Sequence, residues 1–168
     1  RMDLGGTQIL FDALRTGQVD AYPEYTGTGL LEILGAPRAG GPEETYREVK
    51  QQFDARYGLE WLQPFGFNNS YALAMQRERA QELGIRTISD LEAHPDLPVG
   101  ISLEFLNRAD GWNALVDAYD LRMPNVRGMQ HGLAYEAIAQ GEIALTDAYT
   151  TDGKLERYDL VVLEDDRR

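Results

Sequence analysis

Short segments with helical and with strand periodicity alternate along the chain, and this alternation restricts the fold more than any other feature of the sequence. Apolar spacing predicts helices over residues 3–17, 42–57, 76–83, 110–121 and 132–140, with a shorter helix that begins at Ser89. Strand-sized apolar runs cover residues 19–22, 59–62, 71–75, 99–102, 143–149 and 160–163. This pattern indicates an α/β architecture in which mostly parallel strands are covered by helices.

Aromatic side chains gather near the ends of the predicted strands, where open α/β sheets bind their ligands. They are Tyr22, Tyr25 in the loop predicted over residues 24–29, Tyr71, Tyr149 and, just after the strand over 99–102, Phe105. A quaternary ammonium cannot form hydrogen bonds, but aromatic faces attract it, and each desolvated ring contributes about 0.5–2 kcal/mol. Several such rings together predict a cage for a small cation.

Composition argues against several classes of partner other than a small molecule. The chain has 168 residues, of which 43% are hydrophobic, enough for one medium domain or two small lobes. Its formal net charge of -12 argues against nucleic acid and anionic lipid as partners and suits a cationic or zwitterionic solute. The chain has no cysteine, so disulfides and thiolate metal sites are excluded.

Catalytic motifs are absent from the sequence. His94 and His131 have no Ser, Cys or Asp at a motif spacing, and two histidines without cysteine offer little to a transition metal. The acidic run over residues 164–166 is expected to be a solvated tail. An enzyme that uses Asp147, Asp152 or His131 is an alternative that no motif supports, so the sequence favours binding without a cofactor or metal over catalysis.

Five segments resemble one known family. They read DLGGT at residues 3–7, VDAYPEYTGT at 19–28, FNNSYALAM at 67–75, EFLNRADG at 104–111 and TDAYTTDG at 146–153. In this order they resemble the osmoprotectant (glycine betaine/choline) substrate-binding proteins of ABC transporters. The YPEYTGT run is the most specific of them, and the resemblance covers nearly the whole chain.

The resemblance implies a fold of the periplasmic-binding-protein type, with two lobes that close around the ligand. Residues 1–65 would form part of the first lobe, residues 66–160 the second lobe, and residues 161–168 the start of the return to the first. It also implies a non-enzymatic protein that works outside the cytoplasm, periplasmic or membrane-anchored. Its partners would be a small quaternary amine and an ABC permease in the membrane.

The resemblance also assigns ligand-binding residues. By motif match, an aromatic box around the trimethylammonium head would consist of Tyr71, Phe105 and Tyr149. Its fourth ring would be Tyr22 or Tyr25 from the first motif, and the sequence does not decide between them.

Two polar residues complete the implied site. Arg108 would hold a ligand carboxylate, which matches the planar fork of a guanidinium group. Asn69, two residues before Tyr71, is expected to support the site.

The chain departs from the family at both ends, where the family's first strand and helix and a late return strand have no counterpart. An incomplete first lobe would leave exposed sheet edges, which predicts a homodimer formed by strand exchange or parts that lie elsewhere. Two alternative functions stay open. One is a ligand-sensing domain on the same scaffold, and the other is a binder of a different trimethylammonium compound, such as a histidine-derived one.

Overall fold

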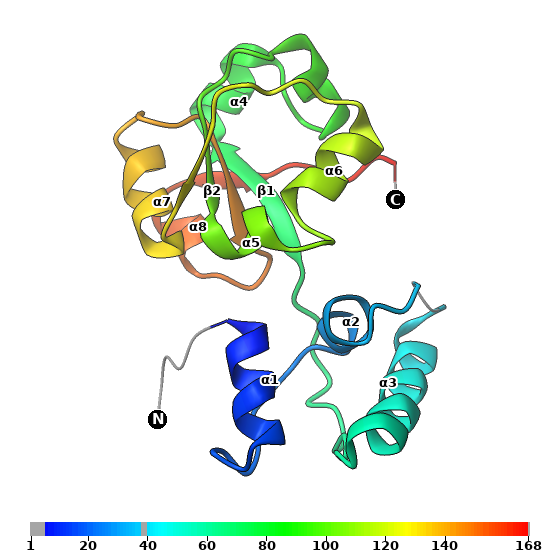
Figure 1. Cartoon of the computed structure of the whole chain (residues 1–168). Coiled ribbons are helices and arrows are strands. Elements are labelled where there is room, and N and C mark those ends of the chain that lie inside the picture. Colours follow the sequence, from blue (N-terminus) through cyan, green and yellow to red (C-terminus); the bar gives the residue numbers. More distant parts are fainter. Residues whose placement is uncertain (1–5, 38–39, 168) are drawn as a thin grey trace. The chain divides into compact units, whose positions relative to one another are not determined.

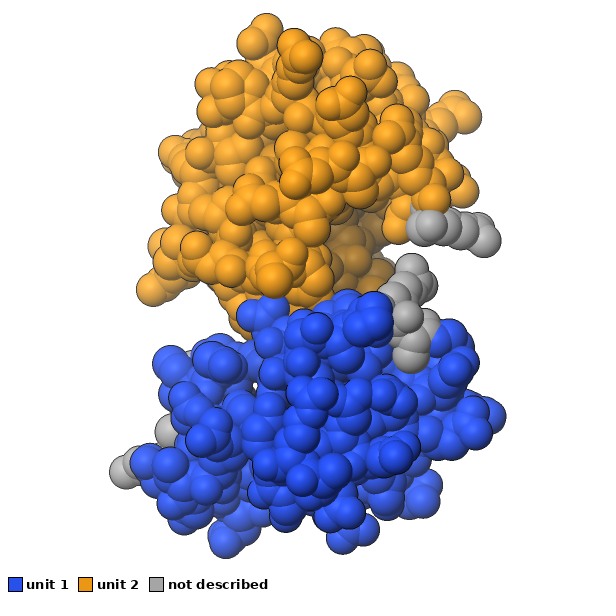
Figure 2. Space-filling view, turned by 45° about the vertical axis from the view of Figure 1, so that its right-hand side comes forward, with its two compact units in different colours: residues 1–66 blue, residues 67–168 orange. Residues whose placement is uncertain are grey.

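The computed structural model describes residues 6–37 and 40–167. The chain divides into two compact units, Arg1–Gly66 and Phe67–Arg168, which Figure 2 shows in blue and orange. Each unit has its own hydrophobic core. They are called unit 1 and unit 2 below.

The described residues of unit 1 form helices joined by irregular segments, without a strand. Its elements are α1 (Thr7–Arg15), α2 (Thr26–Thr28), the π-helical turn η1 (Gly29–Ile33) and α3 (Pro42–Tyr57). Helix α3 coincides with the predicted helix, because Pro42 stands in the first turn, where its missing N–H is not needed. Glu43 and Glu44 in the first turn and Arg56 in the last suit the helix dipole.

The core of unit 1 is built around aromatic side chains. The Phe53 ring meets Phe11 and Trp61 edge to face, at centroid distances of 5.8 and 5.3 Å. A Cβ atom at Gly29 would lie 2.7 Å from the Trp61 ring, so this position requires a glycine. The second glycine of the Thr-Gly-Thr-Gly run therefore has a packing role.

Three predictions for unit 1 were wrong. Residues 19–22 and 59–62 are not strands, and the loop predicted over 24–29 contains α2 and the start of η1. A strand forms only when a neighbour accepts its backbone hydrogen bonds, and the described part of unit 1 offers no such neighbour. The exposed sheet edge expected in the first lobe is therefore not found in these residues. Residues 3–5 of the predicted first helix lie outside the described residues.

Unit 2 contains a five-stranded mixed sheet (Figure 1). The strands are β1 (Tyr71–Gln76), β2 (Val99–Ser102), β3 (Val126–Met129), β4 (Leu145–Tyr149) and β5 (Leu160–Val162), in the order β3-β2-β4-β1-β5. Strand β2 pairs parallel with β3 and β4, whereas β1 pairs antiparallel with β4 and β5. The prediction of mostly parallel pairing was too simple, since it did not foresee that β1 runs against its neighbours.

Helices cover both faces of this sheet (Figure 1). They are α4 (Arg77–Leu83), the 3-10 helix η2 (Ser89–Ala93), α5 (Leu103–Asn107), α6 (Trp112–Tyr119), α7 (His131–Ala139) and α8 (Lys154–Arg157). One core contains Leu73, Ile101 and Trp112, and the other contains Ala74, Ile138 and Ala148. Leu73 and Ala74 belong to different cores because side chains alternate along a strand. Strand β3 and helices α5 and α8 were not predicted.

The acidic run near the carboxyl end is bound to unit 2 and is not the solvated tail that was predicted. The Tyr119 hydroxyl donates to Asp165 Oδ1 at 2.5 Å, and Asp166 Oδ1 accepts from the Ser89 N–H at 3.2 Å. Burial raises the pKa of Tyr119 to about 12, and the hydrogen bond to Asp165 is the second cause of this rise. Exposed carboxylates thus attach the end of β5 to α6 and η2.

None of the helices in the described residues has the length and apolar character needed to cross a membrane.

Candidate functional site

The directions of the strands bring the candidate residues of unit 2 to one edge of its sheet. Strands β2, β3 and β4 run in the same direction and end at this edge, while β1, which runs in the opposite direction, begins there. The register pairs Tyr71, the first residue of β1, with Tyr149, the last residue of β4. Directly paired residues share a face of the sheet, so both tyrosines project on the same side.

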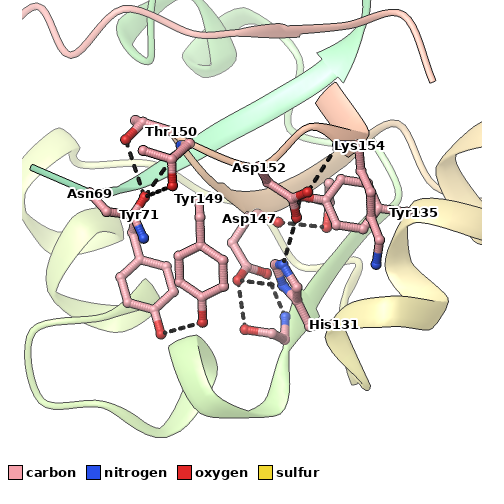
Figure 3. Close-up of polar contacts among 12 residues, drawn as sticks. Asn69, Tyr71, His131, Tyr135, Asp147, Tyr149, Thr150, Asp152 and Lys154 are labelled. Atoms are coloured by element: carbon pink, nitrogen blue, oxygen red, sulfur yellow. Dashed lines mark hydrogen bonds and ion pairs between the residues drawn. The ribbon is translucent and has the colours of Figure 1, made fainter. Parts of the chain in front are cut away.

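Tyr71, Phe105 and Tyr149 form a contiguous aromatic cluster at this edge. The Tyr71 ring stacks on Phe105 at a centroid distance of 4.6 Å and lies 5.0 Å from the Tyr149 ring. The two tyrosine hydroxyls are 3.3 Å apart, within hydrogen-bonding distance (Figure 3). Phe105 is only 4% exposed, whereas both tyrosines are partly exposed. Phe105 therefore forms the buried part of the aromatic cluster, and the two tyrosines provide its accessible ring surface.

Both tyrosines of the aromatic cluster keep their protons at physiological pH. Burial raises the pKa of Tyr71, and its hydrogen bond to Tyr149 raises it further. Burial also raises the pKa of Tyr149, against the opposing effect of the same hydrogen bond. Neutral rings with protonated hydroxyls can attract a cation through their faces without carrying a charge themselves.

Arg108 also lies against the aromatic cluster, but its guanidinium group already binds a carboxylate of this chain. Its Nε and Nη2 atoms donate to the two carboxylate oxygens of Asp110 at 2.7 and 2.8 Å, and its Cζ atom lies 5.5 Å from the Tyr71 ring centroid. A Cβ atom at Gly111 would collide with the Phe105 carbonyl oxygen, so this tight turn requires glycine. The predicted role of Arg108 with a ligand carboxylate stays a prediction.

Asn69 connects the start of β1 to the loop after β4. Its Oδ1 atom accepts from the Thr151 hydroxyl at 2.9 Å and from the Thr151 N–H at 3.3 Å. The Thr150 hydroxyl accepts from the Ser70 N–H at 3.1 Å, which strengthens the same connection. Asn69 thus supports the backbone that carries Tyr71 and Tyr149, and no ligand is needed to explain its contacts.

Tyr22 and Tyr25 belong to unit 1. Tyr22 is partly buried, and burial, with the charge of Glu24 and a hydrogen bond to it, raises the pKa of the Tyr22 hydroxyl. Tyr25 is 42% exposed, and its N–H donates to Glu24 Oε1 at 2.8 Å. The choice between these two rings stays open.

A buried carboxylate below the aromatic cluster was not assigned a binding role from the sequence. Asp147 has no exposed surface and accepts from the Ser102 N–H at 2.5 Å and from the Ser102 hydroxyl at 2.6 Å. The Ser102 hydroxyl in turn accepts from the Phe105 N–H at 3.2 Å and caps α5. Asp147 therefore sets the position of the helix that carries Phe105.

His131 completes a polar cluster with Tyr135, Asp147 and Asp152 (Figure 3). Its Nδ1 atom lies 3.6 Å from Asp147 Oδ2, and its Nε2 atom lies 3.9 Å from Asp152 Oδ2. The Tyr135 hydroxyl donates to Asp152 Oδ2 at 2.9 Å. The imidazole ring also contacts Tyr149, with 4.8 Å between the ring centroids.

The place of His131 could have been inferred from the sequence, but it was missed along with β3. Helix α7 begins at His131, directly after β3, and β3 ends at the same edge as its parallel neighbour β2. A regular α/β alternation requires a strand between α6 and α7. The short run over residues 126–129, with Gly128 inside it, was the only signal for that strand.

Replacing Asp152 with Asn is expected to destabilise the protein more at about pH 7 than at about pH 3. Burial acts to raise the pKa of the Asp152 carboxyl, but the Lys154 N–H and the Tyr135 hydroxyl outweigh it and lower the pKa from its ordinary 3.8. A depressed pKa stabilises the fold above the unfolded-state pKa, and this stabilisation disappears as the pH falls through the folded-state value. Urea unfolding at both pH values measures the effect. An equal loss at both would contradict the prediction, and Asp117→Asn on the exposed side of α6 is the control.

Within the residues that the structure describes, no group of three or more His, Cys, Asp or Glu side chains is arranged to hold a metal ion. The members of the polar cluster contact one another, and they also contact Ser102 at the end of β2 and Lys154 at the start of α8. Their geometry is that of a support for Tyr149 and α5.

Comparisons with known proteins agree on one family. The family model of the substrate binding domain of the ABC-type glycine betaine transport system matches residues 1–168. A glycine-betaine-binding protein of Pseudomonas aeruginosa is 37% identical over 97% of this chain and 56% of its own length. The ergothioneine transport permease/ergothioneine binding protein EgtU of Helicobacter pylori is 34% identical over 97% of this chain and 29% of its own length.

Solved structures show the same similarity. The crystal structure of a glycine betaine/carnitine/choline ABC transporter protein superposes with a TM-score of 0.71 at 33% identity. The match covers 97% of this chain and 61% of that one. The chain thus spans between about a third and about three fifths of the proteins it matches. The family match extends over every residue, and the chain belongs to the family of substrate-binding domains of ABC-type glycine betaine transport systems.

Proposed function

We propose that the chain captures a small quaternary-ammonium solute, such as glycine betaine or choline, as the solute-binding part of an ABC importer. The observation that carries this proposal is the aromatic cluster, in which Tyr71 and Tyr149 present neutral rings above a buried Phe105. Rings so close together form one surface, from which a bound trimethylammonium head displaces water, and there the head is attracted by more than one ring face. Membership of the family makes a transported solute the natural ligand.

Capture on this surface requires no covalent step. The ligand cation loses water and gains attraction from the ring faces, while the buried carboxylate of Asp147 contributes negative charge on the same face of the sheet. The formal net charge of -12 favours the approach of a cation over long distances at low ionic strength. The protein would therefore act as a binder and not as an enzyme.

The partner would be an ABC permease in the membrane, and the working place would be outside the cytoplasm. Both follow from the task of an importer, which must collect solute on the outer side. Closure of two lobes around the ligand is the motion we expect of the complete protein. A homodimer formed by strand exchange stays a prediction.

Calorimetric titration tests the proposal directly. Glycine betaine or choline is expected to bind, and glycine, which lacks the quaternary head, is expected not to bind. If Arg108 also holds a ligand carboxylate, glycine betaine will bind more tightly than choline. The titration should be made with this chain and with the full-length protein that carries it. Failure of every quaternary amine to bind the full-length protein would refute the proposal.

A second ligand is supported by the similarity to the ergothioneine-binding protein of Helicobacter pylori. Ergothioneine therefore belongs in the same titration series. If it binds at least tenfold more tightly than glycine betaine or choline, a difference of about 1.4 kcal/mol, it replaces them as the proposed solute. A ligand-sensing domain on the same scaffold stays an alternative, which uptake of labelled solute by cells that carry the protein would distinguish.

A further inference from the structure

We propose that His131 is a positioning residue for Tyr149, and that its protonation weakens the capture of a quaternary-ammonium ligand. This inference rests on the proposed function, since it concerns the same aromatic cluster. It adds a residue that no motif indicated and a dependence on pH that the cage alone would not have. A cage of neutral rings around a permanently charged ligand has no reason to change between pH 5 and 8.

Packing, and not hydrogen bonding, holds the imidazole ring in place. His131 lies between two tyrosine rings, with centroid distances of 4.8 Å to Tyr149 and 5.2 Å to Tyr135. Both of its ring nitrogens are buried, and neither makes a hydrogen bond to a described residue. Buried polar atoms without a partner are uncommon in native proteins and call for an explanation.

Two carboxylates explain the unpaired nitrogens. Nδ1 faces Asp147 at 3.6 Å and Nε2 faces Asp152 at 3.9 Å, so both nitrogens lie slightly beyond hydrogen-bonding distance of an acceptor. A neutral imidazole has only one N–H and can satisfy one of these acceptors, whereas a protonated imidazole has two and can satisfy both. The two carboxylates can therefore accept from the protonated ring as well as from the neutral one, and the two forms will differ in their contacts.

The charged form of His131 would compete with the ligand. A cation bound by Tyr149 lies within about 6 Å of the ring centroid, and the imidazole occupies the same ring's surroundings at 4.8 Å. Protonation adds a positive charge beside the bound cation and cancels part of the negative charge of Asp147 and Asp152. Both effects lower the affinity, so binding is expected to weaken as the pH falls.

Other titratable groups face His131 from the elements packed around it. From α7 and β4, Tyr135 and Tyr149 have a raised pKa, and Asp152, which follows β4, has a lowered one. Asp147 faces the ring from β4 itself. Lys154 of α8 lies 4.9 Å from the Tyr135 ring centroid. Histidine is the side chain that ordinarily changes charge between about pH 5 and about pH 8.

The test compares His131→Gln with the wild type and with His94→Gln. The sequence contains two histidines, and His94 precedes β2, at the opposite end of that strand from Ser102. Glycine betaine and choline are titrated between about pH 5.5 and about pH 8, where their charge does not change. Wild type and His94→Gln are expected to bind roughly tenfold more weakly at the lower pH. His131→Gln is expected to bind almost equally at both pH values.

Proton linkage gives a second measurement that needs no variant. Because the ligand favours the neutral ring, binding within the titrated pH range must release protons, which calorimetry detects in buffers of different ionisation enthalpy. Wild-type binding without proton release, or the same pH dependence in His131→Gln as in the wild type, would overturn the inference and leave the proposed function intact. Failure of the wild type to bind either ligand at any pH would overturn the proposed function and this inference with it.

Discussion

Replacement of Tyr149 with Ala is expected to weaken the binding of glycine betaine or choline at least tenfold, an energy of about 1.4 kcal/mol or more. The Tyr149 ring is the link between the two clusters, since it lies 5.0 Å from Tyr71 and 4.8 Å from His131. Its loss removes one accessible face from the cage and the hydroxyl that fixes Tyr71. Water would then reach the remaining ring, which weakens its attraction for a cation as well.

A matched variant separates the ring from its hydroxyl. Tyr149→Phe keeps the ring face and loses only the hydrogen bond to Tyr71, so its affinity is expected to stay within about threefold of the wild type. Calorimetric titration of both variants under the same conditions gives the comparison. If Tyr149→Ala binds like the wild type, the cage is wrong. If Tyr149→Phe loses as much affinity as Tyr149→Ala, the hydroxyl and not the ring face carries the binding.

Replacement of Asp147 with Ala is expected to lower the free energy of unfolding by about 2–4 kcal/mol. The carboxylate accepts two hydrogen bonds from Ser102 in a region where both residues are buried. The variant leaves the Ser102 N–H without this acceptor and creates a cavity next to the core. The start of α5 loses its support, because the Ser102 hydroxyl that caps it is held by Asp147.

Urea unfolding followed by fluorescence measures this loss. Asp117→Ala on the exposed side of α6 is the control, and it is expected to change the stability by less than about 0.5 kcal/mol. An Asp147→Ala variant as stable as the control would show that the buried carboxylate is not needed for the fold.

For Arg108, the family motif and the contacts in the structure indicate different roles. The resemblance assigned this residue to a ligand carboxylate, and its guanidinium group does lie near the Tyr71 ring. In the structure its Nε and Nη2 atoms form a paired interaction with Asp110, and the Arg108 side chain is only 8% exposed. A buried arginine with such a partner also positions the turn that carries Gly111. The comparison of glycine betaine with choline will show whether it has a second role.

The local sequence was sufficient to identify much of unit 2 and the two longer helices of unit 1, α1 and α3. Helix α3 and strand β2 have the predicted bounds, and β1 was one residue longer than predicted. These elements follow from periodicity and from near neighbours in sequence, such as Pro42 at the start of α3. Tyr71, Phe105 and Tyr149 were also singled out, because aromatic residues next to strand ends are visible without a structure.

Tertiary structure alone decided how these residues meet. The direction of β1 puts Tyr71 beside Tyr149, the burial of Phe105 makes it a support, and the parallel pairing of β3 brings His131 to the same edge. The strands expected in unit 1 did not form, because a strand exists only with a partner that its own sequence does not specify. Periodicity reports which side of a segment is apolar. The direction of a strand, its neighbours and the distances between side chains depend on contacts between residues far apart in the sequence.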